Sequence, residues 1–113
     1  MGVGRHLIVD VGNINDFELL NYANTIQPLM EKIIRDCNLS VVGELKHQFY
    51  PIGATIVYLL EESHLSIHTY PELRSCSIDL YSCNTETDFN TALEVIYNFF
   101  NRECYILKKI INR

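Results

Sequence analysis

The sequence predicts one α+β domain, in which an antiparallel sheet carries two helices on one face. Three observations indicate this fold class. Short runs rich in β-branched residues follow one another in hairpin succession, two longer segments repeat apolar residues at helical spacing, and 113 residues is the length of a single domain. Because strands joined as hairpins form antiparallel sheets with one buried face, we expect the order β-α-β-β-β-β-α-β.

The N-terminal third is expected to hold a strand and the longer helix. Residues 5–11 form a short apolar run that is typical of a strand. Asn15 and Glu18 have the spacing of a capping box, and apolar residues then recur with helical period over 16–37. Pro28 lacks an N–H and clashes with the preceding turn, so we expect a kink or two shorter helices meeting there.

The remaining elements alternate with turn signals. The second helix is expected to be capped within residues 85–88 and to run to about residue 101. The expected strands are 39–49, 54–60, 64–70, 75–83 and 104–111.

Polar residues gather on one face of the two central strands. Side chains alternate along a strand, so each strand presents one polar set: His64, Ser66, His68 and Tyr70 in the first, and Ser77, Asp79, Tyr81 and Cys83 in the second. A hairpin centred on residues 72 and 73 would pair His68 with Ser77 and place Cys83 across from Glu62. This composition is more typical of a lined pocket than of a solvated sheet face, which is the alternative interpretation.

Two kinds of site are disfavoured by the residues themselves. His64 and His68 would lie about 13 Å apart along a strand, too far to share one ion, so we expect no metal. A hydrolase using Ser63, His68 and Asp79 is conceivable, but the chain has no GxSxG elbow.

The composition excludes several partners. A net charge of −5, without a basic cluster, argues against binding nucleic acid or an anionic membrane. The longest apolar run, 56–60, is too short to span a bilayer, and residues 1–6 match neither a signal peptide nor a myristoylation site. The four cysteines have no CxxC spacing, so we expect reduced thiols and a cytoplasmic protein.

One stretch of the sequence closely resembles a known processing signature. "ESHLSIHTYPE" (62–72) is similar to the cleavage site of the small prokaryotic-type S-adenosylmethionine decarboxylases. Three further stretches agree in order and spacing: "GRHLIVD" (4–10), "KHQFYPIG" (46–53) and "SIDLYSCN" (77–84). The resemblance covers most of the chain.

This resemblance implies a self-cleaving proenzyme. The chain would split between Glu62 and Ser63 into 1–62 and 63–113, and Ser63 would become a covalent pyruvoyl cofactor that forms a Schiff base with the substrate amine. Neither a metal nor pyridoxal phosphate is implied. Since no encoded side chain offers an electrophilic carbonyl, such a protein makes one from its own backbone. The resemblance also implies a homodimer, an α/β/β/α sandwich with sites shared where two polar sheet faces meet.

The resemblance assigns a role to each matching residue. His68 would take the α-proton during processing, and Cys83 would return a proton to the substrate carbon after carbon dioxide leaves. Glu72 would hold the ribose hydroxyls, while Phe49 and Tyr70 are candidates to stack on adenine or face the sulfonium.

Several positions depart from the family pattern. Thr55 replaces the serine that assists processing, and Ile56 replaces a glycine, so both are expected to crowd the site. Arg74 lies in a changed segment where it would favour a carboxylate, Asn84 replaces a glycine, and Asp10 stands where a glutamate is common.

The functional hypothesis is decarboxylation of S-adenosylmethionine, which supplies aminopropyl groups for spermidine and other polyamines. Because the departures cluster around the substrate pocket, a pyruvoyl enzyme acting on arginine or ornithine is the alternative. A catalytically silent regulatory paralogue is the third hypothesis. The retained Ser63, His68 and Cys83 argue against it, since a silent subunit needs none of them.

Overall fold

The computed structural model describes residues 4–113, so the expectation for the first six residues lies partly outside the described part. Its elements follow the predicted order, with two short 3₁₀ helices added. They are β1 (Arg5–Gly12), η1 (Phe17–Leu20), α1 (Ala23–Asp36), β2 (Val41–Gln48), β3 (Ala54–Leu60), β4 (Ser63–Tyr70), η2 (Pro71–Leu73), β5 (Ser75–Ser82), α2 (Phe89–Phe99) and β6 (Tyr105–Asn112).

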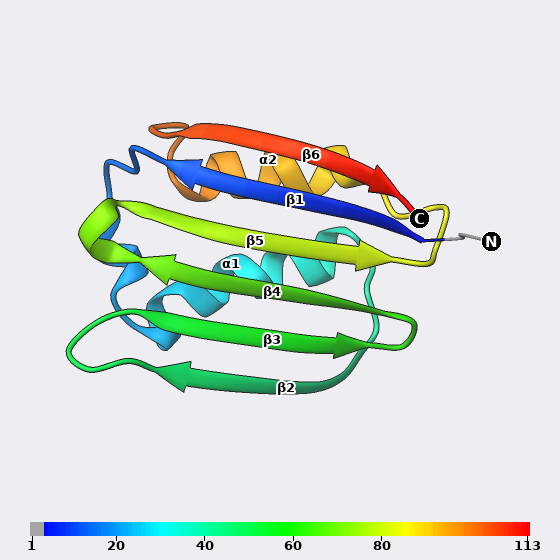
Figure 1. The fold of residues 1–113 in the computed structure, drawn as a ribbon, viewed down its shortest axis with the longest axis horizontal. Helices are drawn as coiled ribbons and strands as arrows, with labels where there is room; N and C mark the ends of the chain where they lie inside the picture. Colours follow the sequence, from blue (N-terminus) through cyan, green and yellow to red (C-terminus); the bar gives the residue numbers. More distant parts are fainter. Residues whose placement is uncertain (1–3) are drawn as a thin grey trace.

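The six strands form one antiparallel sheet in the order β2-β3-β4-β5-β1-β6. Both helices cover the same face of it, and within the described residues 4–113 the other face carries no helix (Figure 1). The predicted α+β fold with two helices on one face is therefore confirmed. Within residues 4–113, neither helix is long and apolar enough to cross a membrane.

The predicted register of β4 and β5 is also confirmed. His68 pairs with Ser77, as the hairpin centred on residues 72 and 73 requires. On the other side β4 pairs with β3 through a tight turn, in which Leu60 faces Ser63 and only Glu61 and Glu62 lie between them. Both turn residues are exposed.

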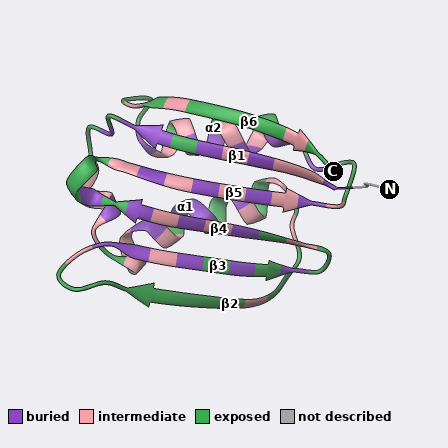
Figure 2. Ribbon diagram, viewed as in Figure 1, coloured by how far each residue is buried: buried purple, intermediate pink, exposed green. Residues whose placement is uncertain are grey.

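The hydrophobic core lies between the sheet and the helices. A row of aliphatic side chains crosses four strands there, because Ile56 faces Ile67, Ile67 faces Ile78, and Ile78 faces Val9. None of these is more than 1% exposed. Burying each such side chain contributes roughly 1.5–3 kcal/mol, and the alternating burial is visible along the central strands (Figure 2).

The first helical segment differs from the prediction. The sequence predicts one helix over 16–37 with a break at Pro28, whereas the structure ends η1 at Leu20, starts α1 at Ala23 and continues the helix through Pro28. Because Pro28 has no N–H, the Asn24 carbonyl lacks its usual partner in the helix. Both residues are exposed, so solvent can hydrogen-bond to that carbonyl instead.

The predicted capping box is wrong as well. The Asn15 amide donates to Glu103 at 3.4 Å instead of capping a helix. Helix α1 begins after Tyr22, whose backbone N–H donates to Thr25 Oγ1 at 3.3 Å. Helix α2 does start as predicted, because the Asp88 side chain accepts from the Asn90 backbone N–H at 2.9 Å.

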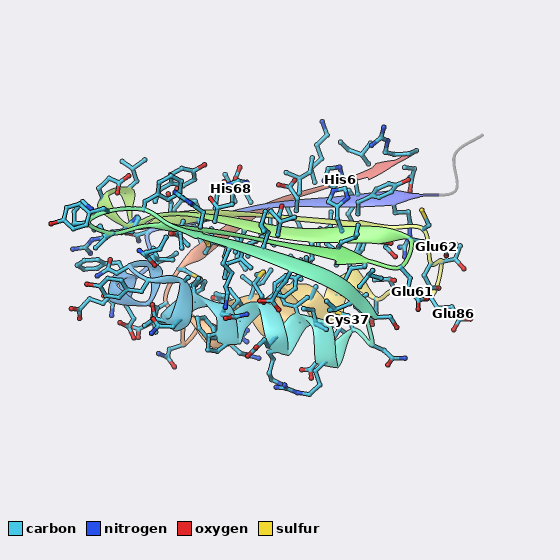
Figure 3. All side chains as sticks on the ribbon, turned by 90° about the horizontal axis from the view of Figure 1, so that it is seen from below. His6, Cys37, Glu61, Glu62, His68 and Glu86 are labelled. Atoms are coloured by element: carbon cyan, nitrogen blue, oxygen red, sulfur yellow. The ribbon has the colours of Figure 1, made fainter. Side chains whose placement is uncertain are left out.

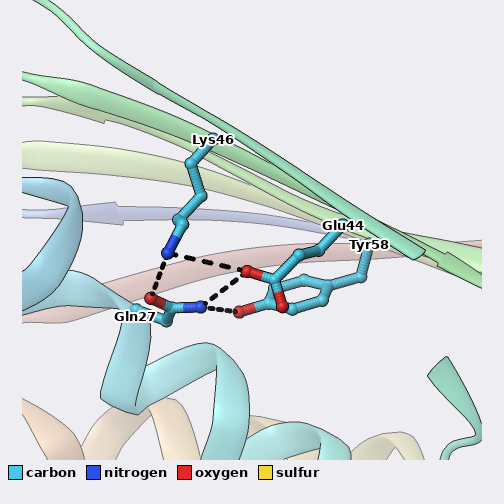
Figure 4. Close-up of polar contacts among 4 residues, drawn as sticks. All are labelled: Gln27, Glu44, Lys46 and Tyr58. Carbon is cyan, nitrogen blue, oxygen red and sulfur yellow. Dashed lines mark hydrogen bonds and ion pairs between the residues drawn. The ribbon is translucent and has the colours of Figure 1, made fainter.

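A polar network joins α1 to the edge of the sheet (Figure 4). The Gln27 side-chain amide donates to Glu44 at 3.0 Å and to the Tyr58 hydroxyl at 3.1 Å, and Lys46 donates to the Gln27 carbonyl oxygen at 3.0 Å. Burial raises the pKa of Tyr58 above its ordinary value. This network fixes where α1 lies against β2 and β3.

Candidate active site

The face of the sheet away from the helices, here called the outer face, carries the polar residues singled out from the sequence. His6 and His68 lie on this side, opposite the helices (Figure 3). Strand alternation assigns further residues to the same face: Thr55, Val57 and Leu59 of β3, His64 and Ser66 of β4, Ser77, Asp79 and Tyr81 of β5, and Ile8 and Asp10 of β1.

One end of the outer face brings together residues 62, 63, 81 and 83, which we call the cleavage end. The Cys83 backbone N–H donates to Ser63 Oγ at 3.2 Å. The Cys83 sulfur lies 3.7 Å from the Tyr81 hydroxyl oxygen. The Glu62–Ser63 peptide therefore sits where an exposed turn meets the start of β4, across from Cys83.

Aromatic rings surround Tyr81 at this end. The His64 ring stacks on it with centroids 5.6 Å apart, and the His6 ring meets it edge-on at 6.1 Å. His6 Nε2 in turn lies 3.1 Å from Asp79 Oδ1. The Arg113 guanidinium lies 5.6 Å from the Tyr81 ring centroid.

The other predicted residues gather at the opposite end of β4, which we call the binding end: Phe49, Thr55, His68, Tyr70 and Glu72. Thr55 Oγ1 lies 3.0 Å from His68 Nδ1. Phe49 belongs to the loop between β2 and β3, and its ring centroid lies 4.6 Å from that of the His47 ring. Phe49 and Tyr70 are 48% and 40% exposed, so both offer ring surface to a ligand.

The two ends lie far apart in a single chain. Ser63 and His68 are five residues apart on the same strand, which is roughly 16 Å at the usual strand rise. His68 therefore cannot reach the residue 63 α-proton of its own chain.

The alternative hydrolase triad does not form either. His68 contacts Thr55 rather than Ser63, and Asp79 contacts His6. Among residues 4–113, no three His, Cys, Asp or Glu side chains are grouped so as to hold a metal ion.

The positions that depart from the family pattern have separate surroundings. Ile56 was expected to crowd the site, but this is wrong, because strand alternation turns its side chain into the core. The Arg74 guanidinium lies 4.5 Å from the Phe17 ring centroid. Asn84 Oδ1 accepts from the Glu86 backbone N–H at 2.8 Å, and Asp10 accepts from the Ser77 hydroxyl at 2.8 Å.

One cavity of about 270 Å³ lies at the outer face and is lined by Asp10, Tyr70, Ser77 and Tyr105. Another, of about 110 Å³, lies beside Ser63 and the turn, but its lining includes the buried Leu60, Ser82 and Thr87, so it opens toward the helix side of the sheet. A larger groove of about 520 Å³ runs between α1 and α2 and contains none of the predicted site residues.

Sequence reasoning missed the residue that holds the Phe49 loop in place. The Gln48 amide nitrogen lies within 3.1 Å of the carbonyl oxygens of Asn21, Phe49 and Gly53, while its oxygen accepts from the Ala23 backbone N–H at 2.7 Å. A lone polar residue at a strand end carries no signal for such a role.

Comparisons with known proteins identify the family of the chain. A family model described as S-adenosylmethionine decarboxylase matches residues 5–113. The chain is 37% identical to an S-adenosylmethionine decarboxylase proenzyme from Brevibacillus brevis, over 96% of this chain and 80% of that one. It is 36% identical to S-adenosylmethionine decarboxylase proenzyme 2 from Bacillus cereus, over 96% and 87% of the two chains.

A solved structure shares the fold. The crystal structure of the adenosylmethionine decarboxylase from Aquifex aeolicus superimposes with a TM-score of 0.88, at 30% sequence identity, over 99% of this chain and 91% of that one. The match to the family model spans nearly the whole chain, and both relatives exceed 30% identity over most of their length. The chain therefore belongs to the S-adenosylmethionine decarboxylase family.

Proposed function

We propose that this protein is a self-processing, pyruvoyl-dependent decarboxylase of S-adenosylmethionine, whose product donates aminopropyl groups for polyamine synthesis. The observation that carries the proposal is the cleavage end, where Ser63 follows an exposed turn and its hydroxyl accepts a hydrogen bond from Cys83. Family membership supports the substrate. A cytoplasmic location stays a prediction.

The residues at the cleavage end fit conversion of Ser63 into a pyruvoyl group. The Ser63 hydroxyl attacks the Glu62 carbonyl carbon and displaces the Ser63 nitrogen, which gives an ester and a free amine. A base then removes the residue 63 α-proton, and the Cβ–Oγ bond breaks to release the chain ending at Glu62 as a carboxylate. Water finally replaces the nitrogen left on residue 63, and ammonia departs. The scissile peptide lies in a two-residue turn. Breaking it therefore leaves the ladder between β3 and β4 intact.

The pyruvoyl group would supply an electrophilic carbonyl that draws electrons from the substrate carbon as carbon dioxide departs. The chain's own residues bind the substrate and deliver the proton. Cys83 is the proposed proton donor, since its backbone N–H contacts Ser63 Oγ at 3.2 Å and so places the residue beside position 63. Glu72 holds the ribose hydroxyls, while Phe49 and Tyr70 present exposed rings to the adenine and the sulfonium.

The two ends of the outer face combine in a homodimer. Because His68 lies roughly 16 Å from Ser63 along β4, the histidine that acts on Ser63 must come from a second copy. The outer face also exposes apolar side chains suited to such a contact: Leu45, Val57, Leu59, Tyr105 and Leu107. A twofold axis through this face would place the cleavage end of each protomer against the binding end of its partner.

Carbon dioxide release tests the proposed activity. The purified protein is incubated separately with S-adenosylmethionine, arginine and ornithine, each labelled in the carboxyl group. Release from S-adenosylmethionine alone is the expected result. Release only from an amino acid would replace the proposed substrate, and no release from a cleaved chain would contradict the decarboxylase assignment.

A further inference from the structure

We propose that Tyr81 is a positioning residue for the Cys83 thiol, acting through a hydrogen bond between its hydroxyl and the sulfur. This inference rests on the proposed function, in which Cys83 donates the proton. The Tyr81 hydroxyl oxygen lies 3.7 Å from Cys83 Sγ, within hydrogen-bonding range for sulfur. The two side chains can meet because residues two apart on a strand project from the same face.

The Tyr81 ring is itself held in place from several directions. His64 stacks on it at 5.6 Å with an interplanar angle of 29°, and His6 meets it at 6.1 Å and 83°. Asp79 fixes His6 through a 3.1 Å contact, and Arg113 lies over the tyrosine ring at 5.6 Å. These contacts leave the hydroxyl little freedom, as a positioning role requires.

Cys83 is held at two points in the uncleaved chain. Its backbone N–H donates to Ser63 Oγ at 3.2 Å, and its sulfur contacts Tyr81. The first contact places the residue beside position 63, and it is lost on cleavage because Ser63 Oγ leaves with Glu62. The second limits rotation of the thiol, so that the proton donor keeps one orientation relative to the substrate carbon.

The Tyr81 hydroxyl can also stabilise the negative charge that remains on the Cys83 sulfur after proton donation. When the thiol proton moves to the substrate carbon, the sulfur keeps the bonding electron pair and becomes a thiolate. The hydrogen bond with Cys83 and, secondarily, desolvation raise the pKa of Tyr81, and the weaker opposing influence comes from Arg113. Tyr81 therefore keeps its proton at neutral pH and can donate it in a hydrogen bond to that thiolate.

A first experiment measures the contact without requiring turnover. In the uncleaved Ser63→Ala chain, alkylation of Cys83 by iodoacetamide is followed at pH 8 by peptide mass spectrometry, with and without Tyr81→Phe. We expect Cys83 to react about three- to tenfold more slowly in the double variant, because the reactive thiolate loses a hydrogen bond. Cys104 serves as the internal reference, and Tyr97→Phe is the matched control on α2.

A second experiment measures the consequence in the processed protein. Tyr81→Phe should cleave as fully as the unaltered chain and lose about three- to tenfold in kcat, with KM for S-adenosylmethionine within about twofold. Unchanged alkylation of Cys83, or equal slowing at Cys104, would overturn the proposal. If alkylation slows while the unaltered chain releases no carbon dioxide, the contact is supported and the proposed function is overturned.

Discussion

At the scale of single residues, the four cysteines lie in different surroundings that set their reactivity. Cys76 belongs to the core, and burial raises its pKa strongly. Burial, then the nearby Asp36 and Asp88 carboxylates, raise the pKa of Cys37 to about 11. Cys83 is half-buried on the outer face, beside Tyr81. Burial therefore keeps the Cys37 and Cys76 thiols protonated at neutral pH.

Cys37 should resist alkylation at moderate pH. Its pKa is raised in the folded protein, so the thiol stays protonated until the pH approaches about 11. At pH 8 we expect it to react at least about tenfold more slowly than after denaturation, because only the thiolate is nucleophilic. Site-resolved mass spectrometry across a pH series measures this. An alkylation rate of Cys37 that levels off below pH 9 would contradict the raised pKa.

The sequence predicts the residue scale only in part. Alternation correctly places His68 and Ser77 opposite each other, because a two-residue period and one hairpin centre determine the register. The contact between Tyr81 and Cys83 was not predicted, since it depends on side-chain rotamers. The number of residues between Ser63 and His68 can be counted in the sequence. That His68 cannot reach Ser63 of its own chain follows only from the structure, in which both residues belong to one unbroken strand.

At the scale of elements, strands were easier to predict than the first helical segment. Turn residues mark both ends of most strands, so their bounds agree within about two residues. The break between η1 and α1 was misplaced at Pro28, because tertiary contacts determine it. Asn21, in the break, accepts from the Gly53 backbone N–H at 2.8 Å, a partner far away in the sequence.

Thr69 ties β4 to two other elements and should be costly to replace. Its buried hydroxyl donates to the Leu20 carbonyl at 2.8 Å and accepts from the Ala54 backbone N–H at 2.8 Å. Thr69→Val keeps the side-chain shape but leaves the Leu20 carbonyl and the Ala54 N–H without this partner. We therefore expect the free energy of unfolding to fall by about 1–3 kcal/mol.

Urea denaturation in the uncleaved Ser63→Ala background measures this change without interference from chain cleavage. Thr85→Val is the matched control, because Thr85 is exposed, and it should change stability by less than about 0.5 kcal/mol. Equal stability of the two variants would show that the Thr69 hydroxyl does not join these elements.

At the scale of the whole molecule, the sheet order explains how a cleaved chain would stay assembled. Residues 1–62 supply β1, α1, β2 and β3, and residues 63–113 supply β4, β5, α2 and β6. The two segments interleave, since β1 lies between β5 and β6. Hairpin succession predicts the neighbours of β3 and β4, but the long-range insertion of β1 has no local signal in the sequence.

Shared sites in a dimer predict complementation between two defective chains. We expect His68→Ala alone to remain uncleaved. When it is coexpressed with Ser63→Ala, the intact His68 of one copy can act on the intact Ser63 of the other. The His68→Ala chain should then become cleaved while the Ser63→Ala chain stays whole, which intact mass distinguishes. A His68→Ala chain that stays uncleaved in the mixture would contradict sites shared between protomers.

The central claim is that Ser63 becomes the cofactor when the chain cleaves itself after Glu62. Intact mass spectrometry of the purified protein and of Ser63→Ala tests it most directly. We expect two fragments from the unaltered chain, 1–62 with a free carboxyl end and 63–113 with the mass of a pyruvoyl group at its start, and one uncleaved chain from Ser63→Ala. A second fragment that begins with an ordinary serine, or cleavage of the Ser63→Ala chain, would contradict the claim.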